Sequence, residues 1–138
     1  MIKVVLDCSI AVSWFFEDEA SEKTDDILAI IQEEGAFVPA IWHLEFGNVL
    51  IQAEKKRRIS KAQVINCLEL IKELPITTDN DHSDKYMDRI IALALEHQIT
   101  TYDASYLELS MRLGLSLATK DKKLYQVANK LGIPVLPK

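Results

Sequence analysis

Four carboxylic acids in this sequence stand where the side chains of an α/β protein would converge: Asp7, Glu45, Asp103 and Asp121. Asp7 closes a largely apolar, β-branched segment at residues 2–6, and Asp121 follows a second predicted strand at residues 115–119. In a parallel sheet both would lie at the carboxyl edge, where such sheets form their crevice. Asp103 opens a predicted helix, and helix starts in this architecture face the same edge. The pattern therefore predicts at least three acids in one crevice.

Each acid also has an ordinary structural interpretation. Asp7, Asp103 and Asp121 precede or begin predicted helices, where a carboxylate caps free N–H groups, contributing about 1 kcal/mol, or is favoured by the helix dipole. Glu45 flanks the apolar stripe of a predicted helix that carries Trp42 and Phe46. A salt bridge to a nearby basic residue would explain it equally well. Taken one at a time, the acids leave both interpretations open.

Convergence of these acids would create a conflict that a cation resolves. Carboxylates in one crevice repel each other, which raises their pKa values and destabilises the fold. Oxygen ligands without His or Cys select Mg²⁺ or Mn²⁺, ions that bridge to substrate phosphates. The corresponding chemistry is metal-assisted hydrolysis of a phosphodiester. No Ser-His-Asp or Cys-His arrangement competes for a catalytic role, because the histidines, His82 among them, lack ligand spacing.

Strand-like and helical segments alternate along the chain. Predicted strands occupy residues 2–6, 37–38, 75–78, 115–119 and 133–136. The first leads into a predicted helix at residues 10–16, and apolar residues recur at i, i+3, i+4 and i+7 in three later segments, which begin at Val64, Met87 and Leu124. Gly114 and Gly132 follow helical segments, where a left-handed C-cap would end the helix. The order predicts an α/β fold with a mostly parallel sheet of four to five strands between helices.

The composition indicates one globular domain spanning residues 1–138. The chain has 49% hydrophobic and 27% charged residues, with four Gly, four Pro and no linker-like stretch. Its apolar runs are far shorter than the roughly 20 residues of a membrane-spanning helix. The N-terminal segment lacks the apolar core of a signal peptide, which favours a cytoplasmic protein. Cys8 and Cys67 form no CxxC pair and are expected to be small buried hydrophobes.

Four short strings, in this order, resemble the PIN-domain nucleases, and specifically the VapC-type toxins of type II toxin-antitoxin pairs. They are VLDCS at residues 5–9, PA at 39–40 leading to LE at 44–45, YDASY at 102–106 and LATKD at 117–121. The resemblance spans the whole chain and implies a PIN-like three-layer sandwich. It carries Asp7, Glu45, Asp103 and Asp121 over as catalytic, metal-binding acids, with Ser9 and Thr119 supporting their geometry.

The same resemblance implies a Mg²⁺-dependent endoribonuclease that cleaves single-stranded or looped RNA, such as tRNA, rRNA or mRNA. It also implies a homodimer, held inactive by a small VapB-like antitoxin. Two alternatives remain: a PIN nuclease that processes RNA without an antitoxin, and a non-catalytic metal-binding or receiver-like regulatory module. A receiver would need paired acids after the first strand, where this chain has Asp7 followed by Cys8 and Ser9.

Three groups of side chains beyond the acids have both a functional and a structural interpretation. The aromatic run at residues 14–16 either packs in the core or helps form an antitoxin groove. The basic residues at 55–58 and Lys61 are expected to form a solvated face. Lys120, Lys122 and Lys123 surround Asp121 and are candidates for contacts with RNA phosphates.

The net charge of −5 argues at first against a nucleic-acid partner. Residues 17–34, however, hold eight acids and one lysine, and the four conspicuous acids add another four negative charges. The remaining chain has 15 basic against nine acidic residues, a net charge of +6. Phosphate is therefore expected to approach over this remainder, and a basic protein partner over the acidic segment.

Overall fold

Five parallel strands form the centre of the computed structural model, which describes residues 3–81 and 84–138. The strands are β1 (Val4–Leu6), β2 (Ala36–Pro39), β3 (Ile76–Asp79), β4 (Ser116–Ala118) and β5 (Val135–Leu136). The helices are α1 (Cys8–Ser13), the 3-10 helix η1 (Glu17–Glu19), α2 (Glu22–Glu34), α3 (Ile41–Lys55), α4 (Lys61–Lys72), α5 (Asp84–His97), α6 (Thr101–Leu113) and α7 (Lys122–Lys130). Residue 2 of the first predicted strand and His82 lie outside the described residues.

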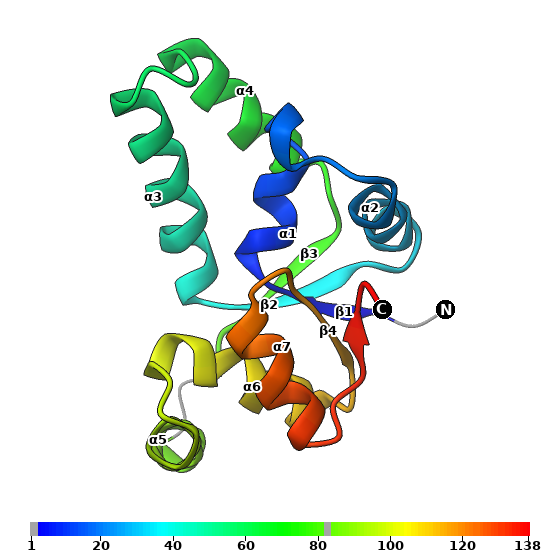
Figure 1. Ribbon diagram of the computed structural model, residues 1–138, viewed down its shortest axis with the longest axis vertical. Helices are drawn as coiled ribbons and strands as arrows, with labels where there is room; N and C mark the ends of the chain where they lie inside the picture. Colours follow the sequence, from blue (N-terminus) through cyan, green and yellow to red (C-terminus); the bar gives the residue numbers. More distant parts are fainter. Residues whose placement is uncertain (1–2, 82–83) are drawn as a thin grey trace.

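The sheet has the strand order β3-β2-β1-β4-β5, with every neighbouring pair parallel. The chain moves outward from β1 to β3, then returns across the sheet to β4 and β5. Helices α1 to α4 lie on one side of the sheet and α5 to α7 on the other (Figure 1). This three-layer α/β architecture confirms the predicted fold class. The strand order switches direction between β1 and β4, where open parallel sheets form their binding crevice.

The core follows the predicted pattern in most elements. Val5 of β1 is fully buried and pairs with Phe37 and Leu117 on its two neighbouring strands. Cys8 and Cys67 are free and buried, as their isolated positions in the sequence predict. Gly114 adopts a left-handed conformation with φ 67° and ends α6, which confirms the predicted C-cap. No helix in the described ranges has both the length and the apolar character needed to cross a bilayer.

Helix α1 is shorter than the predicted helix at residues 10–16, because it ends at Ser13. The aromatic run therefore lies mostly in the turn that follows, where consecutive side chains can point in different directions. Phe16 is buried, Phe15 packs against Phe46, and Trp14 donates its indole N–H to the Thr24 carbonyl. The run thus packs into the core, as the first of the two interpretations of this segment predicts.

Helix α5 forms as its 3.6-residue period predicts, but its apolar stripe does not face the core. None of its described residues is buried, and Met87, Ile91 and Leu95 expose 52%, 44% and 77% of their surface. The physical reason is its position: α5 packs on α6 and stands at the periphery of the molecule (Figure 1). The 3.6-residue period predicted the helix correctly but did not predict what would cover it.

Candidate active site

Asp7 is the most buried of the four acids, with 7% of its surface exposed. Although it stands at the N-cap position of α1, its carboxylate makes no capping hydrogen bond. Its Oδ2 accepts hydrogen bonds from Ser9 Oγ at 2.6 Å and from Thr119 Oγ1 at 2.7 Å. Burial raises the pKa of Asp7, the two hydroxyl groups oppose this shift, and the charge of Asp121 raises the pKa further. The capping interpretation of Asp7 is therefore wrong.

The Ser9 and Thr119 hydroxyls join two loops around this carboxylate. While each donates its proton to Asp7, Ser9 Oγ accepts the backbone N–H of Lys120 at 2.9 Å, and Thr119 Oγ1 accepts that of Asp121 at 3.0 Å. Each hydroxyl thus donates one hydrogen bond to the Asp7 carboxylate and accepts one from a backbone N–H group. This arrangement ties the β1–α1 connection to the β4–α7 connection across the switch in strand order. Ser9 and Thr119 lie where a supporting role requires them.

Glu45 reaches the same region from the second turn of α3. Its Oε1 accepts a hydrogen bond of 2.6 Å from the hydroxyl of Tyr106, a fully buried residue of α6. Burial raises the pKa of Glu45, the Tyr106 hydrogen bond lowers it, and the charges of Asp7 and Asp103 raise it. Within the described ranges Glu45 forms no ion pair, so the salt-bridge interpretation does not hold.

Tyr106 is a site residue to which the sequence reasoning assigned no role. It stands three residues after Asp103, and the i, i+3 spacing places both side chains on one face of α6. That spacing was the available signal. It could not identify Glu45 as the partner, because the two residues are 61 positions apart.

Asp103 occupies the first turn of α6 without capping it. The N-cap is Thr100, whose Oγ1 accepts the backbone N–H of Asp103 at 3.0 Å. Partial burial raises the pKa of Asp103, and the charges of Asp121 and Asp7 raise it further. The carboxylate is therefore directed toward the other acids, and a different residue performs the capping role.

Asp121 combines the two alternatives that the sequence left open. Its Oδ1 accepts the backbone N–H of Leu124 at 2.9 Å, which caps α7. Its charge also raises the pKa values of Asp7 and Asp103, so it lies near both. One carboxylate oxygen is thus occupied by the helix, and Asp121 is the exposed member of the group.

The four acids form a linked electrostatic group at the carboxyl edge of the sheet: Asp121 acts on Asp7 and Asp103, Asp7 acts on Asp103, and both Asp7 and Asp103 act on Glu45. Their oxygen donors suit a hard divalent cation. Among the residues that the structure describes, no three His, Cys, Asp or Glu side chains are arranged to hold a metal ion directly. The donor chemistry thus fits Mg²⁺, an ion that retains several waters, but a closed set of direct ligands is not formed.

The three lysines near Asp121 differ in placement. Lys120 Nζ donates to the Glu19 carbonyl at 3.2 Å, which directs this ammonium group toward η1. Lys122 and Lys123 are exposed in the first turn of α7. Cations at a helix N-terminus oppose the helix dipole, so these two positions do not serve helix stability.

Comparison with known proteins identifies the family. A model described as PIN domain matches residues 4–130. The chain belongs to the PIN domain family. This PIN domain is 27% identical over 123 residues to Ribonuclease VapC3 of Pyrobaculum aerophilum, covering 89% of the chain and 92% of that protein.

Two solved structures share the fold of this PIN domain. The crystal structure of PAE2754 from Pyrobaculum aerophilum superposes with a TM-score of 0.71 at 20% identity, covering 98% of this chain and 84% of that one. A toxin-antitoxin complex from Klebsiella pneumoniae gives a TM-score of 0.61 at 19% identity, with coverage of 89% and 90%. At these identities the likeness extends to the fold alone.

Proposed function

We propose that this PIN domain is a Mg²⁺-dependent endoribonuclease and the toxin of a toxin-antitoxin pair, acting on single-stranded or looped RNA in the cytosol. The observation that carries the proposal is the group formed by Asp7, Glu45, Asp103 and Asp121 at the switch in strand order. Burial and mutual repulsion keep the pKa values of the first three raised. A divalent cation offsets that repulsion. The names of the relatives support the nuclease and toxin assignment.

The residues around the acids orient them for metal-assisted hydrolysis. Ser9 and Thr119 hold one oxygen of Asp7, and Tyr106 holds one oxygen of Glu45. Among the described residues, no other side chain donates a hydrogen bond to either carboxylate, so a cation or its water would bind at their remaining oxygens. When bound, the cation supplies ionisation of the attacking water and charge stabilisation of the phosphate. Lys122 and Lys123 would meet RNA phosphates next to the acids, with Lys120 held beside them.

Two partners belong to the same proposal. A VapB-like antitoxin would bind the chain and cover the acids. A second copy of the chain would cover the exposed apolar stripe of α5, which no described element of this chain buries.

The direct test is cleavage of total RNA by the purified chain with Mg²⁺ or with EDTA. We expect cleavage only with Mg²⁺, and a loss of at least about a hundredfold in Asp103→Asn and Asp7→Asn. Asp26→Asn, an exposed acid of α2, is the matched control and should cleave like the parent. Cleavage that persists in EDTA or in both site variants contradicts the metal-carboxylate mechanism. Divalent binding without cleavage would instead favour the non-catalytic metal-binding module.

A further inference from the structure

A cavity of about 190 Å³ opens beside the acids, at the carboxyl ends of β2 and β3. We propose that it is a subsite for one nucleobase of the RNA strand, selective for bases that carry an amino group over uracil. This inference rests on the proposed function, because it places the strand's cleaved phosphate at the acids. The cavity shares none of its lining residues with the four acids or their hydroxyl partners.

The cavity and the four acids are bordered by the same helices. Ile41 lines it from α3, one helical turn before Glu45, and Ser105 lines it from α6, the helix that also carries Asp103. The same two helices therefore border both sites. A strand with its phosphate at the acids would have a neighbouring base within reach of the cavity.

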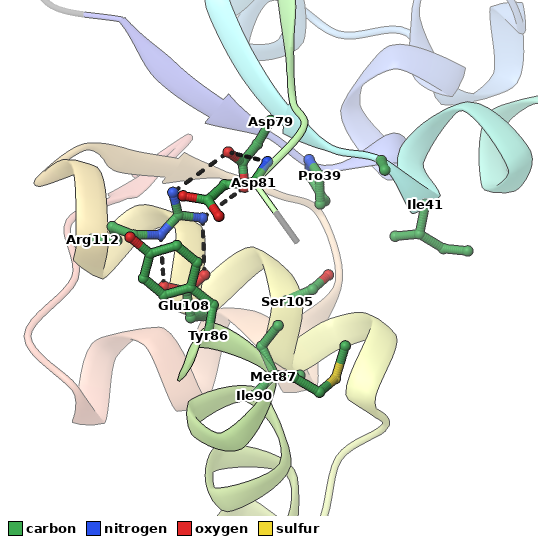
Figure 2. A pocket seen from close by; sticks show the side chains of 11 residues that line it. Pro39, Ile41, Asp79, Asp81, Tyr86, Met87, Ile90, Ser105, Glu108 and Arg112 are labelled. Atoms are coloured by element: carbon green, nitrogen blue, oxygen red, sulfur yellow. Dashed lines mark hydrogen bonds and ion pairs between the residues drawn. The ribbon is translucent and has the colours of Figure 1, made fainter. Parts of the chain in front are cut away.

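The walls of the cavity are mainly apolar and suit a flat ring. Pro39 and Ile41 form one side, and Met87 and Ile90 of α5 form the other, with Ser105 between them (Figure 2). The volume is below that of pockets for drug-sized ligands, which begin at about 300 Å³. A single base, unstacked from its neighbours, is the part of an RNA strand that such a space admits.

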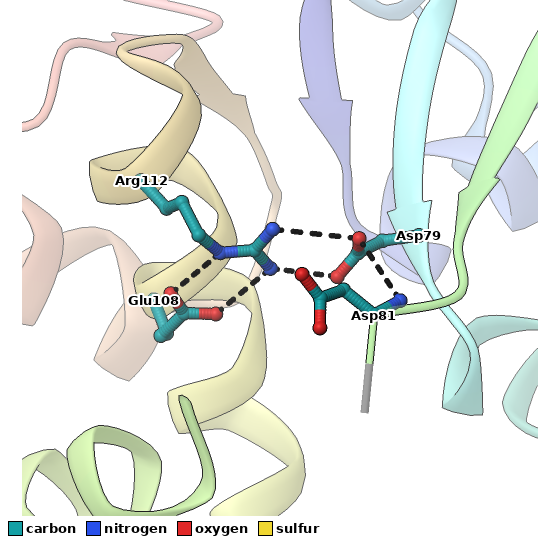
Figure 3. Close-up of polar contacts among 4 residues, drawn as sticks. All are labelled: Asp79, Asp81, Glu108 and Arg112. Carbon is teal, nitrogen blue, oxygen red and sulfur yellow. Dashed lines mark hydrogen bonds and ion pairs between the residues drawn. The ribbon is translucent and has the colours of Figure 1, made fainter. Parts of the chain in front are cut away.

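The polar end of the cavity is organised around Arg112. Its guanidinium donates to both oxygens of Glu108, at 2.9 and 3.1 Å, and to both oxygens of Asp79, at 2.6 and 3.4 Å (Figure 3). The ring of Tyr86 lies 4.1 Å from the guanidinium carbon. Arg112 is thereby fixed as a rigid, planar wall, and its charge is exceeded by that of its two carboxylate partners.

The charge of these residues determines which part of an RNA strand the cavity would bind. The two carboxylates of Asp79 and Glu108 exceed the single positive charge of Arg112, so this network carries a net charge of −1. A phosphate would be repelled, whereas an amino group on a neutral ring can donate to carboxylate oxygens. Adenine, guanine and cytosine have such a group and uracil does not. The cavity therefore favours a base over a phosphate, and an amino-bearing base over uracil.

Methionine methyl signals give a test that is independent of catalysis. The chain has three methionines, of which Met87 lines the cavity and Met111 does not. In protein labelled with methyl-¹³C methionine and free of divalent ions, we expect cytidine to shift the Met87 signal. Uridine should need at least about a tenfold higher concentration for the same shift. The Met111 signal should stay in place in both titrations.

The outcomes separate this inference from the proposed function. Equal responses to cytidine and uridine, or none, overturn the base subsite whether or not the chain cleaves RNA. A stronger response to Nα-acetylarginine amide overturns it in favour of a cationic side chain from a protein partner. A selective cytidine response in a chain that cleaves no RNA would retain the subsite and reject the nuclease.

Variants provide the second arm. Ile90→Trp fills the cavity, so we expect the cytidine shift to disappear, and with it the preference for an amino-bearing base beside the cut. Ile65→Trp, an exposed isoleucine of α4, is the size-matched control and should keep both. If Ile90→Trp fails to fold, Asp79→Asn removes one of the two carboxylate charges beside Arg112 while keeping the size of the side chain, and it should reduce the cytidine preference. Retention of that preference in a folded Ile90→Trp or in Asp79→Asn overturns the proposal.

Discussion

Asp7 and Asp121 both stand directly before a helix, yet only Asp121 uses its carboxylate as the cap. The Asp7 carboxylate turns instead to two hydroxyl groups, one of them 112 residues away. Helix capping satisfies a single donor, whereas the hydroxyl pair stabilises a buried charge that would otherwise lack a partner. At the scale of single residues, the site is built by diverting Asp7 from an ordinary structural role.

Removing the Asp7 charge should stabilise the metal-free protein at neutral pH. Burial and the charge of Asp121 raise the pKa of Asp7 in the folded state. The contribution of protonated Asp7 to the free energy of unfolding is therefore fully present below the unfolded-state pKa, and it is lost as pH rises through the folded-state pKa. We therefore expect Asp7→Asn to raise the free energy of unfolding at pH 7.5 by about 1 kcal/mol or more. The difference should shrink toward pH 3.

Thermal unfolding in EDTA across this pH range measures the effect, with Asp26→Asn as the exposed control. Added Mg²⁺ should raise the Tm of the parent and leave that of Asp7→Asn almost unchanged. An Asp7→Asn variant less stable than the parent at pH 7.5 would show that the hydroxyl network outweighs the repulsion.

At the scale of elements, α5 and α6 divide the work on their side of the sheet. Helix α6 packs on β1, β2 and β4 and carries Asp103 and Tyr106 into the site. Helix α5 contacts mainly α6 and leaves Ile91 and Leu95 exposed. Exposure of an apolar stripe to water is unfavourable in free energy. This is the physical basis for the proposal that a second copy of the chain covers the stripe.

We expect Leu95→Glu to shift the chain from dimer to monomer. The substitution places a charge at the C-terminal end of the α5 stripe, on its most exposed apolar residue, where an apolar contact between copies would bury it. Sedimentation velocity at several concentrations measures the change, and Leu44→Glu, an exposed leucine of α3, is the control. A parent that stays monomeric at high concentration contradicts the proposed homodimer.

At the scale of the whole molecule, charge is segregated by element. Acids are concentrated in η1 and α2, although Arg58 neutralises part of this segment by pairing with Asp18 and Glu19. Arg58 also lies over Phe16, so one member of the basic group at residues 55–58 has a structural role. Lys122 and Lys123 of α7 directly follow Asp121, and under the proposed function RNA would approach there.

Salt dependence provides a measure of this approach. We expect the Lys122→Gln, Lys123→Gln double variant to weaken RNA binding. The plot of log K against log salt should become less steep by about 1.4, which corresponds to the loss of two phosphate contacts with a single strand. Binding in Ca²⁺ at several salt concentrations measures the slope. Lys130→Gln, at the opposite end of α7, should leave it unchanged. An unaltered slope in the double variant would remove these lysines from the RNA path.

The sequence alone determined the local features of this protein. Apolar segments ending at Asp7 and shortly before Asp121 predicted strand ends at one sheet edge, and the 3.6-residue period predicted helices α4, α5 and α7. These features depend on neighbours within a few positions, so a linear pattern records them. The predicted sheet between helical layers followed from the alternation of such segments.

Only the tertiary structure decided the partners of those residues. It directed Asp7 to Thr119, Glu45 to Tyr106 and Asp79 to Arg112, and it left the stripe of α5 uncovered. The partners in these pairs are 112, 61 and 33 positions apart. Local propensity carries no information about such contacts, because they form only when strand order and helix packing bring distant segments together.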